Sequence, residues 1–209
     1  MKSHLVFRAS LFLFLGFLSG PLLTASTDHL GSVPILLGLD SVRNELGLTK
    51  SQCAKLDRIR ADFKADARTI TTHTPTTPVE KKATNTTVKV LVSKYNERSI
   101  AVLTPAQHER LVQIERQTLG GLVLFLPDEQ KRLGLTPAQI ATIAKIYEEG
   151  ERFASRITGS FEEGKLSLQE RLATLRNDRL KRSAKCLRVL TSAQRKTFQN
   201  LQGMAFNLT

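Results

Sequence analysis

The sequence is poor in the residues that build metal sites and catalytic centres. Its 209 residues include two cysteines, four histidines and no tryptophan. No two histidines are spaced to share a metal ion on one helix face, and neither cysteine has a histidine beside it. A nucleophile elbow, a phosphate-binding loop and paired acids in an apolar setting are also missing from the sequence. We therefore expect no catalytic, cofactor or metal site, and a protein that is not an enzyme.

Long hydrophobic runs are missing except near the start. Residues 1–26 have the layout of a secretory signal peptide: Lys2 and Arg8 are positive, residues 11–18 are apolar, and residues 24–26 are small. The alternative is an uncleaved membrane anchor, but the apolar run is short for ~30 Å of hydrocarbon. We expect cleavage, export to the periplasm of a Gram-negative-type bacterium, and no membrane span in the remaining chain.

Acidic residues are also few, with 19 Asp and Glu against 31 Lys and Arg and a net charge of +12. Removal of Lys2 and Arg8 with the signal leaves the mature chain near +10. Such a charge in the cytoplasm would suggest nucleic acid as the partner. Outside the cytoplasm, acidic proteins or the anionic envelope are the expected partners instead.

An internal repeat decides the expected architecture. Residues 46–52 (LGLTKSQ) reappear as 133–139 (LGLTPAQ), and residues 102–107 (VLTPAQ) reappear as 189–194 (VLTSAQ), each 87 positions later. In both copies the two motifs stand 55 residues apart. After a flexible tail at 27–32, the sequence therefore predicts two tandem units, residues 33–119 and 120–206.

Each unit has the pattern of a helical hairpin. A long amphipathic helix follows the first motif, and its apolar residues fall within an arc of roughly 120–140°. A polar break follows, at 71–78 in the first unit and around 159–164 in the second, and another helix leads to the second motif. Residues 84–92 suit a strand by propensity, but their counterparts at 171–179 do not. We therefore predict an all-α fold of two pseudo-symmetric hairpin repeats. The apolar helix positions are Cys53, Leu56, Ile59, Phe63 and Ile70 in the first unit, and Ile140, Ile143, Ile146, Tyr147, Phe153 and Ile157 in the second.

The four Leu-Thr-x-x-Gln motifs have a structural explanation. Threonine at the helix N-cap accepts a hydrogen bond from the N3 amide, and glutamine at N3 reaches back to the N-cap amide. Pro105 and Pro137 suit the first helical position. Each cap contributes about 1 kcal/mol. We expect this capping role for Thr49, Gln52, Thr104, Gln107, Thr136, Gln139, Thr191 and Gln194.

The paired motifs at 48–52, 103–107, 135–139 and 190–194 resemble those of the Spy/CpxP-like LTxxQ family of periplasmic proteins. The resemblance covers about residues 33–203. It implies an α-helical hairpin protein that dimerises into a curved cradle and acts as an ATP-independent chaperone or restrains an envelope stress sensor. A related branch of the family binds metals. Because this chain has two motif pairs where the family has one, we expect a monomer that acts as a single-chain version of the dimer.

One helix face in the second unit departs from the repeat. Arg179 and Arg182 project onto the apolar side of the predicted helix, where the first unit has Val92 and Tyr95. Two interpretations stay open: a bend lets both arginines reach solvent, or the face lines a groove that binds acidic and apolar segments. In the second interpretation the client-binding residues are Arg176, Arg179, Arg182, Lys185 and Arg188.

Cys53 and Cys186 permit one disulfide in an oxidising compartment. The alternative is two buried free thiols, because both residues fall on or beside apolar helix faces. The sequence favours a chaperone-like protein for unfolded or acidic envelope proteins. Alternatives are a regulatory brake on a membrane sensor domain, a metal-responsive sensor, and a structural envelope protein without clients.

Overall fold

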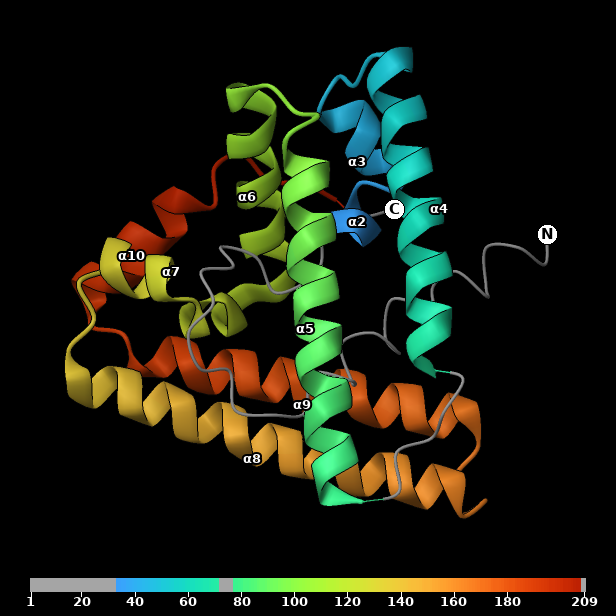
Figure 1. Cartoon of the computed structure of the whole chain (residues 1–209). Coiled ribbons are helices and arrows are strands. Elements are labelled where there is room, and N and C mark those ends of the chain that lie inside the picture. The colour runs from blue at the N-terminus through green and yellow to red at the C-terminus, as the bar shows by residue number, and fades with distance from the viewer. Residues whose placement is uncertain (1–32, 72–76, 208–209) are drawn as a thin grey trace. The chain divides into compact units, whose positions relative to one another are not determined.

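The computed structural model describes residues 33–71 and 77–207, which are helical with short connections and contain no strand (Figure 1). The predicted all-α class is therefore confirmed. The predicted signal peptide at 1–26 and tail at 27–32 lie outside the described residues. The described residues form two compact units: the first comprises 33–118 together with 201–207, and the second comprises 119–200.

In the first unit, helices α4 and α5 lie side by side as a long hairpin (Figure 1). The Phe63 and Tyr95 rings meet edge to face across it, with centroids 5.3 Å apart. The elements are α2 (Val33–Leu36), α3 (Asp40–Glu45), α4 (Lys50–Thr71), α5 (Pro78–Ile100) and α6 (Pro105–Leu119). One end of the hairpin joins a core of Val33, Leu36, Leu37, Val42, Leu46, Leu56, Leu111 and Ile114.

In the second unit, α8 and α9 form the corresponding hairpin (Figure 1). The short helix η1 packs against α9, where the N–H of Gly121 donates to Ser183 Oγ at 2.9 Å. A Cβ atom at Gly121 would lie 2.3 Å from the Ser183 carbonyl oxygen, so only glycine permits this approach. The elements are η1 (Gly120–Phe125), α7 (Pro127–Arg132), α8 (Pro137–Glu162), α9 (Leu168–Val189) and α10 (Ser192–Leu201).

The Leu-Gly-Leu-Thr segments end one helix and start the next. Gly47 and Gly134 take φ values of 58° and 57°, the left-handed conformation that closes a helix. The following leucine N–H groups donate back to Arg43 O at 3.0 Å and Gln130 O at 2.9 Å, as in a Schellman motif. The threonine then begins the next helix.

The apolar face predicted for the first long helix is buried at Leu56, Ile59 and Phe63. The face predicted for α8 is half-buried except at Ile143, which is 1% exposed. Capping boxes formed by Thr77 with Glu80 and by Ser167 with Glu170 begin α5 and α9.

The sequence predicts a polar break in the second unit that includes Gly159, but α8 continues through this residue to Glu162. Nothing within 4 Å crowds Gly159, and a helical glycine costs only about 1 kcal/mol. The helix is closed just beyond Glu162 by Gly164, whose φ is 72°. In the described part of the chain, none of the helices combines the length and apolar character needed to cross a bilayer.

Candidate functional site

The four Thr-x-x-Gln motifs all have the geometry of capping boxes. Each threonine N–H donates to the glutamine Oε1 at 2.9–3.0 Å. Each glutamine N–H donates to the threonine Oγ1 at 3.2–3.3 Å. The motifs therefore satisfy backbone N–H groups at the starts of α4, α6, α8 and α10.

The glutamines also join the two motifs of each unit. Gln52 Nε2 donates to Gln107 Oε1 at 2.7 Å and to the Val102 carbonyl at 3.0 Å. Gln107 Nε2 donates to Gln52 Oε1 at 3.3 Å and to the Leu46 carbonyl at 3.2 Å. We call this reciprocal pair the glutamine clamp.

The second unit contains an equivalent clamp. Gln139 Nε2 donates to Gln194 Oε1 at 2.8 Å and to the Val189 carbonyl at 2.9 Å. Gln194 Nε2 donates to Gln139 Oε1 at 3.2 Å and to the Leu133 carbonyl at 3.3 Å. Both N–H groups and both lone pairs of each amide are thus used within the unit. The motif residues hold helix ends together and offer little to a ligand.

Arg182 lies within the α8–α9 hairpin. Its Nε donates to Asp178 Oδ2 at 2.6 Å, and the two side chains are only 14% and 18% exposed. The guanidinium stem passes directly over Gly150 of α8, where an added Cβ would lie 2.3 Å from three of its atoms. Arg182 is therefore mostly buried within the hairpin, with 14% of its side chain exposed, rather than directed into solvent.

In the first unit, the equivalent positions of the hairpin are occupied by aromatic rings. The counterparts of Gly150 and Arg182, 87 residues earlier, are Phe63 and Tyr95, which contact each other. Tyr95 Oη donates to Asp66 Oδ2 at 2.8 Å, and this hydrogen bond holds the pKa of the Asp66 carboxyl below its ordinary value. The second unit thus has a small glycine and a large arginine in contact where the first unit has two aromatic residues in contact.

The five predicted client-binding residues separate into two groups. Arg179 and Arg182 are half-buried, and burial lowers the pKa of Arg179, with the nearby charges of Arg176 and Arg182 adding to the effect. Arg176, Lys185 and Arg188 are exposed. Only the second group is available to a large partner without rearrangement.

Exposed residues of α9 form a surface that combines the predicted Arg176 and Arg188 with Leu180 and Ala184, which the sequence prediction did not include. Arg176, Leu180, Ala184 and Arg188 follow one another at intervals of four residues, so they lie along one side of the helix. All four are exposed, and Leu180 keeps 55% of its surface. We call these four residues the α9 face. The whole helix carries seven basic and two acidic side chains, which gives it a net charge of +5.

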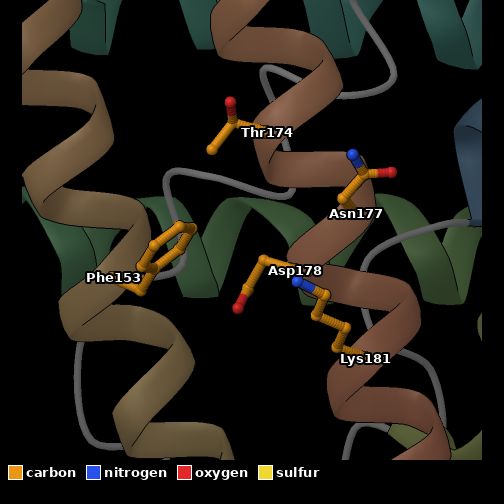
Figure 2. Close-up of a pocket in the computed structure, with 5 residues that line it drawn as sticks. All are labelled: Phe153, Thr174, Asn177, Asp178 and Lys181. Carbon is orange, nitrogen blue, oxygen red and sulfur yellow. The ribbon is translucent and has the colours of Figure 1, made fainter.

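A shallow pocket of about 260 Å³ lies beside the α9 face (Figure 2). Figure 2 shows Phe153 of α8 pointing toward α9, with the Asp178 side chain between the two helices. The first unit has Asp66 where the second has Phe153, and Asp66 pairs there with Lys94 at 3.3 Å. An aromatic ring at this position is thus particular to the second unit. The pocket is lined by Phe153, Thr174, Asn177, Asp178 and Lys181.

Both cysteines are free thiols, so of the two alternatives that the sequence left open the structure contains the one without a disulfide. Cys53 lies in the first unit, where it is half-buried, and Cys186 lies in the second, where it is 2% exposed. Burial raises the pKa of the Cys186 thiol to about 11.

Within residues 33–71 and 77–207, no group of three His, Cys, Asp or Glu side chains is arranged to hold a metal ion. No known protein family, curated protein or solved structure matches this chain. The candidate site therefore depends on the geometry of the α9 face alone.

The sequence analysis did not identify Gly150, Leu180 or Asp178, although the repeat and the residue spacing indicate them. Gly150 changes together with Arg182 between the two copies, and comparison of both hairpin helices would have paired them. Leu180 has the polar counterpart Ser93, so the repeat identifies it as an apolar residue added to a surface position. Asp178 is spaced four residues before Arg182, as in a helical ion pair.

Proposed function

We propose that this chain is an exported, non-enzymatic binding protein that holds unfolded or acidic protein segments on the α9 face. The position of Leu180, exposed between Arg176 and Arg188, supports the proposal most strongly. An exposed leucine covers apolar segments of a non-native chain, which a native protein would bury. The guanidinium groups attract acidic segments over longer distances.

The proposal includes the family and the compartment. The motif pairs suggest a Spy/CpxP-like protein, and residues 1–26 suggest export to the periplasm. An ATP-independent chaperone binds its clients through surface contacts and needs no catalytic centre. In the proposed assembly one chain, with two units, replaces the two protomers of a family dimer.

The test is suppression of aggregation. The mature chain is mixed at stoichiometric ratio with several unrelated denatured proteins, and light scattering is followed during dilution at low and high salt. The α9 face is altered in Leu180→Ser and in the double variant Arg176→Gln with Arg188→Gln. The control is Lys55→Gln with Arg58→Gln, which removes the same charge from exposed positions on α4.

We expect suppression across unrelated clients and weaker suppression by both α9 variants. Exposed ion pairs contribute about 0.2–1 kcal/mol each, so loss of two arginines weakens client affinity by about two- to thirtyfold. High salt reduces this difference. Equal suppression by the α9 variants and the α4 control would remove the α9 face from the proposal. No suppression of any client would favour a dedicated partner, such as a membrane sensor domain.

A further inference from the structure

The chain's own C-terminal segment occupies a binding surface on α6. The sequence repeat extends the second unit to residue 206, but residues 201–207 pack with the first unit. The chain turns at Gly203, whose φ is 64°. A Cβ atom there would lie 2.2 Å from Gln113 Oε1, so a side chain would displace the Gln113 amide, and the left-handed backbone conformation itself favours glycine.

Gln117 of α6 recognises the main chain of this segment at three points. Its Nε2 donates to the Gln202 carbonyl at 2.6 Å and to the Met204 carbonyl at 2.7 Å. Its Oε1 accepts from the Phe206 N–H at 2.7 Å. A single side-chain amide therefore pairs with donors and acceptors of an extended chain, as a neighbouring strand would.

Two arginines of α6 add further main-chain contacts. Arg116 Nη1 donates to the Leu201 carbonyl at 2.9 Å, and Arg110 Nη1 donates to the Met204 carbonyl at 2.9 Å. Arg110 is held independently of the segment, since it pairs with Glu45 at 2.6 Å. Part of the surface is thus preorganised within the first unit.

Positions 203 and 206 constrain the sequence of the segment most clearly. Phe206 packs against the core of the first unit, and the left-handed backbone at position 203 favours glycine. Met204 and Ala205 are exposed, and Met204 keeps 78% of its surface. The surface therefore selects a glycine followed three residues later by an aromatic residue, and it is indifferent to the residues between them.

We propose that α6 carries a peptide-binding groove, formed by Arg110, Gln113, Arg116 and Gln117, whose resident ligand is the chain's own segment 201–207. When that segment is undocked, the groove takes an extended peptide with the pattern Gly-x-x-aromatic. Because the resident segment is tethered, its effective concentration is about millimolar and it excludes weak external peptides. The groove is separate from the α9 face, so its failure would leave the proposed client-binding function standing.

The test measures binding of a fluorescent peptide with the sequence of residues 201–207 by anisotropy. Gly203→Val and, independently, Phe206→Ser undock the resident segment in the full chain, and Met204→Ser is the matched control at an exposed position. We expect the two undocked variants to bind the peptide at least tenfold more tightly than the wild type and the control. Adding Gln117→Ala to Gly203→Val should abolish the gain.

A peptide in which the glycine is valine and the phenylalanine is serine should not bind. Circular dichroism establishes that each variant keeps its helices. The proposal is overturned if folded Gly203→Val and Phe206→Ser chains bind the peptide no better than the wild type. It is also overturned if both peptides bind equally, or if the gain survives the loss of Gln117.

Discussion

Gln139 and Gln194 exchange two amide hydrogen bonds, at 2.8 and 3.2 Å, although 55 residues separate them in the chain. Each also caps the helix that it begins. The same residue type therefore starts two helices and joins their starts to each other. Gln52 and Gln107 do the same in the first unit, so each motif pair fixes where its long hairpin closes.

Gln139→Ala should lower the free energy of unfolding by about 1–3 kcal/mol. The substitution removes the capping bond to Thr136 and leaves the Val189 carbonyl and the Gln194 amide with fewer partners. Urea denaturation of the full chain measures the change. Thr142→Ala is the control, because its hydroxyl bonds only to the Ala138 carbonyl of its own helix turn. Equal effects of the two substitutions would mean that the clamp adds no stability.

The effect on stability of a larger residue at position 150 should depend on which residue occupies position 182. Gly150→Ala places a Cβ against the Arg182 side chain and disturbs its pair with Asp178, so we expect it to destabilise the wild-type chain. In an Arg182→Ala background the clash is absent, and the better helix propensity of alanine should make the same change stabilising by about 0.5–1 kcal/mol. A double-mutant cycle in urea measures this coupling. Additive effects would contradict the observed packing.

Acid should lower the stability of the first unit partly by protonating the Asp57 carboxylate. Arg43 Nη2 donates to its carboxylate at 2.5 Å and holds the Asp57 pKa below its ordinary value of 3.8. Because the folded pKa is depressed, this contribution is complete above the unfolded value and disappears as pH falls below about 4. Asp57→Asn should therefore flatten the fall in stability between pH 5 and pH 2, followed by urea denaturation. Arg43→Gln should flatten it too, and a steep fall in both variants would contradict this assignment.

The two thiols should differ in reactivity. Cys186 is buried, and a pKa near 11 leaves on the order of 0.1% of it as thiolate at pH 8. Iodoacetamide should therefore label half-buried Cys53 well before Cys186 in the native protein, as followed by peptide mass spectrometry. In denaturant the two rates should converge. Protection of both residues until a reductant is added would indicate a disulfide and contradict the free thiols.

The helices of this protein are encoded locally. Glycine in a left-handed turn ends a short helix, and the threonine two residues later caps the next one, so Gly47–Thr49 and Gly134–Thr136 mark boundaries that depend on a few neighbouring residues. The threonine boundaries were readable from the sequence, and the capping box at Ser167 follows the same local rule. The repeat also excluded a strand at residues 84–92, where propensity alone was ambiguous.

Contacts between distant segments were decided by tertiary structure. The glutamine clamp requires two helix starts 55 residues apart to meet, and a capping pattern carries no information about that meeting. Arg182 lies within the α8–α9 hairpin because Gly150 on the opposite helix leaves space and Asp178 supplies charge. Residues 201–207 join the first unit because Gln117 pairs with their main chain and Phe206 packs against its core. The sequence by itself determined the long helices and most of their starts, whereas packing across the chain decided which polar side chains are buried and which remain available to a partner.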